Sequence, residues 1–225
     1  MSALLNEGRI RKLLSKHLRD AGLAKGAALI SELCIADFGR RADLVLANGK
    51  LSAFEIKSDI DDLSRLDGQI DTFVKYFESV TIVCAPRHTA NVLTRVPSTV
   101  GVWEVTNAAL VEVQHAGTNE ITDKAVWLSY LPVTELRAVL KQHAIRPIGL
   151  RPDLVEQAQQ ISVSDLRSYV LNYFKRRKRV IAKRVDQRAL RPMAENPIEM
   201  HRRQIDIFIA GCGFVPGTPA IPRRT

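Results

Sequence analysis

A predicted β-hairpin between residues 40 and 57 constrains the fold of this chain more than any other feature. Two strand-like stretches, RRADLVLA and KLSAFEIK, flank the dipeptide Asn48-Gly49. This dipeptide is typical of tight turns between antiparallel strands. The two strands are therefore expected to lie side by side, and the turn decides which of their side chains share a face.

The length of the turn sets the register of the hairpin. A two-residue loop would pair Asp43 with Phe54 and send Asp43 and Glu55 to opposite faces. A three-residue loop, with a positive φ at Gly49, pairs Asp43 with Glu55 and Leu44 with Phe54. We predict the second register because it matches apolar with apolar residues.

In this register Asp43, Glu55 and Lys57 converge on one face. Two neighbouring carboxylates repel each other and need a cation between them. Lys57 would serve as a salt-bridge partner, whereas Mg²⁺ or Mn²⁺ would also allow hydrolysis of a phosphodiester. In that case Asp43, Glu55 and the backbone carbonyl of Ile56 would hold the ion, and Lys57 would orient the attacking water. Glu32, on the preceding strand, is either a further metal ligand or an exposed strand-edge carboxylate.

The remainder of the first 115 residues indicates alternating helices and strands. Leucine and isoleucine recur at helical spacing from residue 3 to 21, and the apolar run VTIVCAP is typical of a strand buried on both faces. A second helix is expected to begin at a cap formed by Asp59 or Asp61, with Ile60 on its apolar face. The order helix–strand–hairpin–helix–strand–helix–strand predicts an α/β fold.

The segment 31–105 resembles the PD-(D/E)XK nuclease superfamily, and most closely a group of small bacterial members. Asp43 corresponds to the motif's Asp, with Ala42 in place of the preceding Pro. Glu55, Ile56 and Lys57 correspond to (D/E)XK. The resemblance implies a restriction-endonuclease-like core, in which helices flank a central mixed sheet, and metal-dependent cleavage of nucleic acid.

Other residues around the motif have two interpretations each. Gln69 resembles the catalytic glutamine of RecB-type members, although Phe73 replaces the tyrosine expected after it; otherwise it is a polar residue at a helix boundary. Glu7 corresponds to an acidic residue of the leading helix that sometimes binds metal, or it only favours the helix dipole. Arg41 and Arg65 either contact phosphates or are solvated.

The positive charge of the chain lies in its C-terminal quarter. From Leu171 onward there are 13 Lys and Arg against 4 Asp and Glu, and the resulting +9 equals the net charge of the whole chain. This asymmetry favours a polyanion partner, DNA or RNA, over a merely solubilising tail. The cluster expected to contact nucleic acid is Lys175, Arg176, Arg177, Lys178 and Arg179. Its alternative is a solvated basic face whose aromatic neighbours pack inward.

We expect three parts: a nuclease-like α/β domain over 1–125, a helical basic extension over 126–205, and a Gly/Pro-rich tail over 206–225. The extension resembles a SAP-type DNA-binding motif, with a turn at Gly149 and a basic residue at Arg151. The tail is a candidate site for a protein partner.

The cysteines and the lengths of the apolar runs indicate a reducing, cytoplasmic compartment. Cys34, Cys84 and Cys212 are far apart and two of them lie in apolar runs, so buried free thiols in a reducing, cytoplasmic setting are expected. The charged N-terminus is unlike a signal peptide, and no stretch reaches the roughly 20 apolar residues of a membrane span.

Together these features predict a metal-dependent nuclease that hydrolyses phosphodiester bonds in DNA, in repair or in defence against foreign DNA. The alternative is a non-cleaving nucleic-acid-binding module or subunit on the same fold.

Overall fold

The computed structural model describes residues 4–36, 39–106 and 109–190, and describes the side chains of the last helix as far as Arg177. The chain forms two compact units, Met1–Arg179 and Val180–Thr225. The fold described below is that of the first unit. The expected tail over 206–225, Cys212, and the side chains of Lys178 and Arg179 lie outside the described parts.

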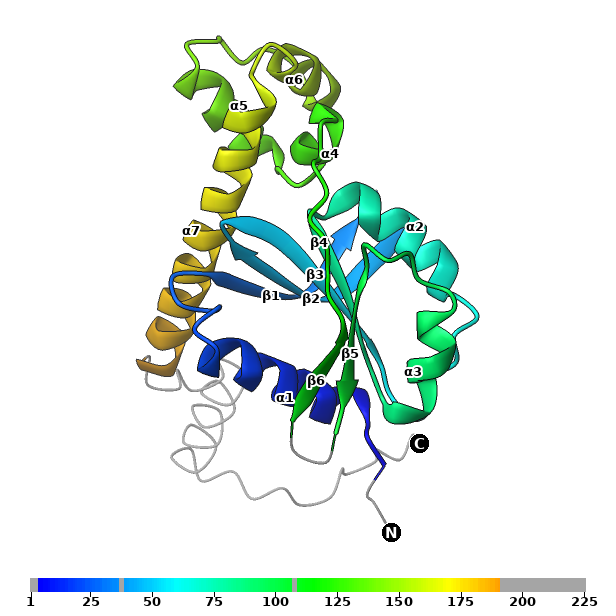
Figure 1. Cartoon of the computed structure of the whole chain (residues 1–225). Helices are drawn as coiled ribbons and strands as arrows, with labels where there is room; N and C mark the ends of the chain where they lie inside the picture. Colours follow the sequence, from blue (N-terminus) through cyan, green and yellow to red (C-terminus); the bar gives the residue numbers. More distant parts are fainter. Residues whose placement is uncertain (1–3, 37–38, 107–108, 191–225) are drawn as a thin grey trace, which may run out of the picture. The chain divides into compact units, whose positions relative to one another are not determined.

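A six-stranded mixed sheet forms the centre of the first unit, with its strands in the order β1 to β6 (Figure 1). The first three strands are antiparallel, β3, β4 and β5 are parallel, and β6 is antiparallel to β5. The strands are β1 Ala28–Ile35, β2 Arg40–Asn48, β3 Lys50–Lys57, β4 Ser79–Cys84, β5 Gly101–Val105 and β6 Leu110–Gln114.

Helices cover both faces of this sheet (Figure 1). The helices are α1 Glu7–Asp20, α2 Leu66–Tyr76, α3 Pro86–Leu93, α4 Lys124–Ser129, α5 Val133–Gln142, α6 Arg151–Ala158 and α7 Val163–Leu190. The α/β class and the flanked mixed sheet predicted from the sequence are therefore confirmed. No described helix is long and apolar enough to cross a membrane.

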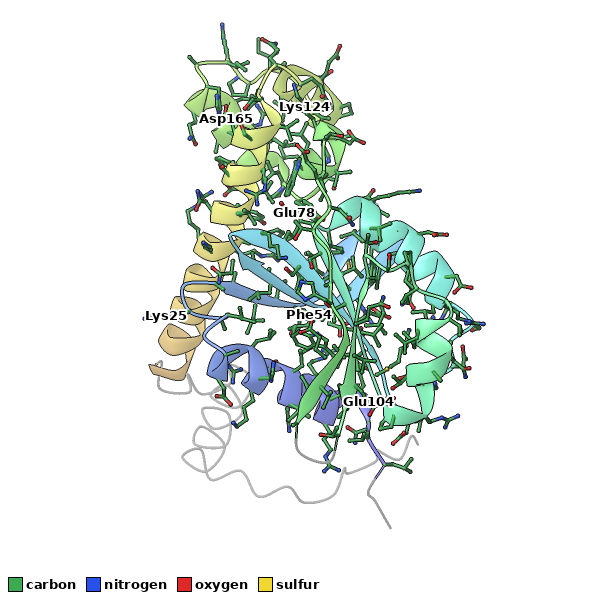
Figure 2. The ribbon with its side chains drawn as sticks, viewed as in Figure 1. Lys25, Phe54, Glu78, Glu104, Lys124 and Asp165 are labelled. Atoms are coloured by element: carbon green, nitrogen blue, oxygen red, sulfur yellow. The ribbon has the colours of Figure 1, made fainter. Side chains whose placement is uncertain are left out.

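Alternation along β3 separates the two hydrophobic cores. Phe54 and Ile56 pack against the buried face of α1, where Ile10 and Leu14 are fully buried. Figure 2 places Phe54 among the side chains at the centre of the sheet. Ala53 belongs to the core on the other face, together with residues of α2. Because successive side chains alternate, Glu55 and Lys57 lie on the α2 face.

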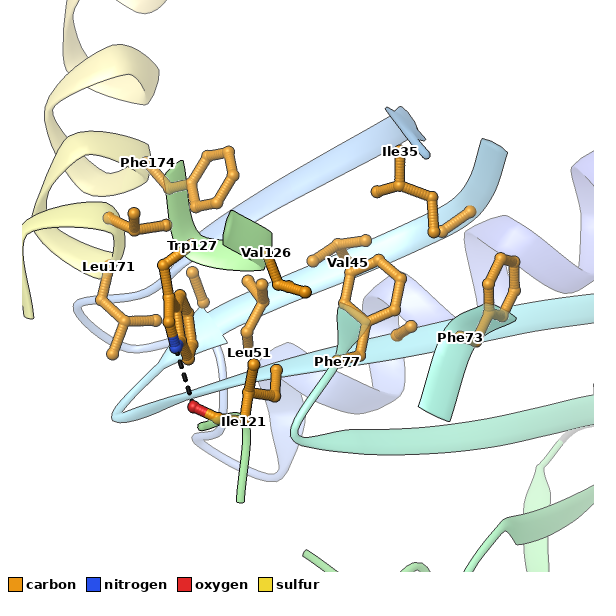
Figure 3. Packing of buried hydrophobic residues seen from close by; sticks show 14 of the residues in the cluster. Ile35, Val45, Leu51, Phe73, Phe77, Ile121, Val126, Trp127, Leu171 and Phe174 are labelled. Atoms are coloured by element: carbon orange, nitrogen blue, oxygen red, sulfur yellow. Dashed lines mark hydrogen bonds between the residues drawn. The ribbon is translucent and has the colours of Figure 1, made fainter. Parts of the chain in front are cut away.

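The helices after residue 124 share the α2-side core with the sheet. Trp127 is fully buried, and its Nε1–H donates to the carbonyl of Ile121 at 3.0 Å (Figure 3). Phe174 of α7 and Phe77 after α2 belong to the same cluster. This apolar continuity accounts for the single compact unit that extends to Arg179.

The structure corrects the predicted start of the second helix. Helix α2 begins at Leu66, and Ile60 is 77% exposed instead of packing inward. Asp59 accepts the backbone N–H of Leu5, and Asp61 accepts the N–H and hydroxyl of Ser58, so neither caps the helix.

Two further differences concern β6 and the thiols. Strand β6 was not predicted, because its valines alternate on a short and largely exposed edge strand. Cys84 is buried, as expected, whereas Cys34 is exposed. The prediction that both thiols are buried is wrong for Cys34.

Candidate functional site

The hairpin has the predicted register. Leu44 pairs with Phe54 and Ala47 with Leu51, and the ladder continues to Asn48 and Lys50, on either side of Gly49. Gly49 in this loop has φ +71°, a conformation that costs other residues energy. This register directs the Asp43 and Glu55 side chains to the same face, as the sequence predicted.

The candidate site lies where β2 and β3 part. Their pairing ends at Leu44 and Phe54, whereas β2 continues alongside β1 as far as Arg40. Beyond this fork the Asp43 carboxylate accepts the backbone N–H of Ile56 at 2.8 Å. The fork opens a polar cavity of about 410 Å³ lined by Glu7, Cys34, Gly39, Arg40, Arg41, Asp43, Glu55, Ile56, Lys57, Asp61, Arg65 and Gln69.

Glu55, Lys57 and Gln69 form a closed hydrogen-bonded group within this cavity. Lys57 Nζ donates to Glu55 Oε1 at 3.0 Å and to Gln69 Oε1 at 2.8 Å. The amide nitrogen of Gln69 donates to the same Glu55 oxygen. Glu55 is only 3% exposed and Lys57 only 7%. Gln69 thus reaches the motif from α2 and fixes the rotamers of both charged side chains.

The second Glu55 oxygen, Oε2, is buried and has no hydrogen-bond partner among the described residues. Burial, followed by the nearby charge of Asp43, raises the pKa of Glu55 to about 7. Burial also raises the pKa of Asp43, against the hydrogen bond from Ile56. A buried carboxylate oxygen without a donor, next to a second carboxylate, has the chemistry that Mg²⁺ prefers. The side chains present therefore fit a divalent ion.

A second acidic group adjoins this pair. Carboxylate oxygens of Glu7, Glu32 and Asp43 lie within 4.8 Å of one another. Arg11 lies among them: its Nη2 contacts Glu7 and Glu32 and is 4.0 Å from Asp43 Oδ1. The positive charge that we expected from Lys57 or a metal thus comes partly from Arg11 of α1.

Glu32 enters the cluster through an unusual backbone conformation. It lies opposite Asp43 in the β1–β2 register but is not paired there, and its φ is +57°. A non-glycine residue in this region stores energy of about 1–3 kcal/mol, a kind of strain common at functional sites. Arg41 forms an ion pair with Glu32, so this predicted phosphate contact has a partner within the protein.

The chain is similar to phage proteins over most of its length. The Bacteriophage P4 protein cII family matches residues 1–196. The chain belongs to this family. "Protein cII" of Enterobacteria phage P4 is 40% identical over 183 residues, which cover 79% of this chain and 69% of that protein. The solved structure of the "SPO1766 protein of unknown function from Silicibacter pomeroyi" matches with a TM-score of 0.42 and 16% identity, over 60% of this chain and 88% of that one.

The family match includes the fork and the basic cluster on α7. There, Arg176 pairs with Glu135 at 2.8 Å and lies over the ring of Tyr169, 5.1 Å from its centroid. Tyr169 is itself buried. Lys175 is half-buried and Arg177 is exposed. Of the cluster residues with described side chains, Arg177 is exposed and has no ion pair with another described residue.

The SAP-like segment of this family member has the expected helix–turn–helix layout. Gly149 has φ +90° and separates α5 from α6. The guanidinium of Arg151 donates to the carbonyl of Leu131 at 2.6 Å and is half-buried. Arg151 therefore has an internal structural contact, and the SAP-type interpretation stays a prediction.

Sequence reasoning missed two groups in the site. Arg11 carried a signal, since it follows Glu7 by four residues on a helix and such residues are neighbours. Asp61 lines the cavity, but its position depends on a loop that had been predicted as helix.

Proposed function

We propose that this chain is a metal-dependent nuclease with a restriction-endonuclease-like core of the PD-(D/E)XK type, acting on phosphodiester bonds in DNA. The observation that carries the proposal is the buried Glu55 Oε2, which lacks a donor and lies beside Asp43 in an open polar cavity. The predicted hairpin register, which brings these carboxylates to one face, supports it.

Asp43 and Glu55 would hold Mg²⁺ or Mn²⁺, with Glu32 and the Ile56 carbonyl as candidate further ligands. The bound ion supplies an acidified water and neutralises charge on the scissile phosphate. Lys57 Nζ has three N–H donors, and two of them are engaged by Glu55 and Gln69. The third would donate to the attacking water or a phosphate oxygen. Gln69 is a positioning residue because it holds both side chains.

Substrate contacts come from cations near the cavity. Arg65 is exposed at the start of α2 and lines the cavity, as does Arg41. Both side chains would contact phosphates near the scissile bond, and Arg41 would then leave its ion pair with Glu32. Arg177, with the rest of the basic C-terminal quarter, would add sequence-independent attraction to DNA, which weakens as salt is raised.

The test is cleavage of plasmid and single-stranded DNA by the full chain with Mg²⁺ or Mn²⁺. Glu55→Gln and Lys57→Met should each lower the rate at least about 100-fold, the typical contribution of such groups. Lys75→Met, an exposed α2 change, is the matched control and should cleave like the wild type. Equal cleavage by all four proteins, or none by the wild type with either ion, would sink the proposal.

A second candidate function is binding of nucleic acid without cleavage. The position of Arg11 among Glu7, Glu32 and Asp43 favours it, since an arginine can neutralise these carboxylates permanently. Its signature is DNA affinity that falls steeply with salt and no turnover with any divalent ion. Affinity that is independent of salt would count against it.

A further inference from the structure

Arg11 occupies an unusual position for a structural salt bridge. A single nitrogen, Nη2, lies against one oxygen of Glu7 and one of Glu32 and is 4.0 Å from Asp43 Oδ1. Carboxylate oxygens of these three residues all lie within 4.8 Å of one another. The nitrogen thus takes the place of a point charge among three carboxylates.

The Arg11 guanidinium does not hydrogen-bond to all three carboxylates. An Nη nitrogen carries two protons, so it serves two of the three carboxylates and leaves Asp43 at 4.0 Å. Arg11 Nε is also buried without a hydrogen-bond partner among the described residues. The fixed fork of arginine suits a bidentate carboxylate, whereas three oxygens around a point suit a small hard cation.

An independent observation also points to a cation here. Glu55 is only 3% exposed, its Oε2 has no hydrogen-bond partner among the described residues, and Glu55 and Asp43 line the same cavity. Asp43 therefore links two groups of carboxylates, one neutralised by Arg11 and one facing Lys57. A divalent ion bound at Asp43 would lie close to the Arg11 charge and would be repelled by it.

We propose that Arg11 is a displaceable internal cation that keeps the metal site closed, so that metal entry requires its guanidinium to leave Glu32 and Asp43. The inference rests on the proposed function, because it concerns the ion that function needs. Arg11 is 24% exposed and its partner Glu7 is 50% exposed, so the side chain has a path to solvent. Its flexible stem allows this withdrawal without movement of α1.

The inference predicts an effect opposite to that of a supporting residue. Removing a ligand-positioning arginine weakens metal binding, whereas removing a competing cation strengthens it. Arg11→Gln should therefore bind Mn²⁺ at least about tenfold more tightly than the wild type, because a positive charge at about 4 Å is lost.

Arg9→Gln is the matched control. Arg9 is exposed, lies on the same helix, and forms no part of the cavity, so the change removes equal net charge. Arg11→Lys keeps the charge on a different head group and should show intermediate affinity. If Arg11→Gln does not fold, as judged by circular dichroism, Arg11→Lys is compared with the wild type in its place.

The measurement is Mn²⁺ titration of EDTA-treated full chain by calorimetry, at pH 8 and fixed ionic strength and without DNA. An Arg11→Gln affinity equal to or below that of the wild type overturns the inference, as does absence of Mn²⁺ binding in both proteins. If Arg11→Gln binds Mn²⁺ more tightly, Glu55→Gln abolishes binding and the wild type does not cleave DNA, the inference about Arg11 holds and the nuclease proposal fails. If the wild type cleaves DNA but Arg11→Gln binds Mn²⁺ no more tightly, the nuclease proposal holds and the inference about Arg11 fails.

Discussion

The Asp43 carboxylate accepts the backbone N–H of Ile56 at 2.8 Å, just beyond the last β2–β3 pair. The Asp43 side chain here accepts the N–H that a paired strand would otherwise satisfy. The same contact fixes the Asp43 charge beside Glu55. After burial, this neighbouring charge is the largest cause of the raised pKa of Glu55.

Asp43→Asn should lower the pKa of Glu55 from about 7 toward its usual value. The amide oxygen can still accept the Ile56 N–H, while the like charge that raises the pKa is removed. A carbon-13 NMR titration of the glutamate carboxyls measures the change. Asp61→Asn is the control, because Asp61 lines the cavity but is not a cause of the shift. An unchanged Glu55 pKa in Asp43→Asn contradicts the prediction.

Glu55→Gln should stabilise the metal-free protein at pH 8. The carboxyl has a pKa of about 7 in the folded protein and 4.5 ordinarily, so the folded state retains a proton that the unfolded chain releases. The free energy of unfolding therefore falls as pH rises from about 4.5 to about 7, by about 3 kcal/mol. Glutamine removes this loss, even though Lys57 also loses its counter-ion.

Urea denaturation in EDTA at pH 5 and pH 8 checks the stability of Glu55→Gln. Relative to the wild type, the free energy of unfolding of Glu55→Gln should increase from pH 5 to pH 8. Glu156→Gln, at an exposed position on α6, should show no such increase. A Glu55→Gln protein less stable than the wild type at pH 8 would show that the Lys57 contact outweighs burial.

The features that were predicted correctly depend on residues close together in the sequence. The register of the hairpin follows from Gly49 and from the match of Leu44 with Phe54, both of which are readable without the rest of the fold. Strand β4 is buried throughout and mostly apolar, and helix α1 has a clear apolar face. These elements bring Asp43, Glu55 and Lys57 together, so the centre of the candidate site was predictable.

The features that were not predicted depend on contacts between residues far apart in the sequence. The helical pattern begins near Ile60, yet the chain there is held in a loop by Asp59 with Leu5 and by Asp61 with Ser58. The contact of Arg11 with Glu32 joins α1 to β1 across 21 positions of sequence. Neither arrangement can be derived from propensity, because both depend on how separate elements pack.

The two described cysteines should differ sharply in reactivity toward a thiol reagent such as DTNB. Cys34 is exposed at the candidate cavity, whereas Cys84 is buried and its pKa is raised by burial to about 11. Because the thiolate is the reactive form, Cys84 should react only after unfolding. In a Cys212→Ser background we expect one fast thiol and one that appears with denaturant.

The control for this assay is Cys34→Ser in the same background. It should show no fast phase under native conditions. Two fast thiols in the Cys212→Ser protein, or a fast phase that survives Cys34→Ser, would contradict the burial of Cys84.

Arg167 should be among the most important charged residues for stability. From α7, its Nε donates to Glu78 Oε1 at 2.7 Å and its Nη2 donates to the carbonyl of Gly49. Glu78 is 5% exposed and its other oxygen accepts the N–H of Leu51 at 2.7 Å. Arg167→Met leaves this buried carboxylate without its counter-ion, which should lower the free energy of unfolding by about 3 kcal/mol.

Guanidinium chloride denaturation of a double-mutant cycle isolates that interaction. Glu78→Gln removes the charge but keeps an acceptor for Leu51, so Arg167→Met should cost much less in the Glu78→Gln background. Arg137→Met is the matched control. Arg137 contacts the carbonyls of Pro147 and Gly149. Its loss should therefore cost only about 1 kcal/mol. Equal costs for Arg167→Met in both backgrounds would show that Arg167 acts through Gly49 alone.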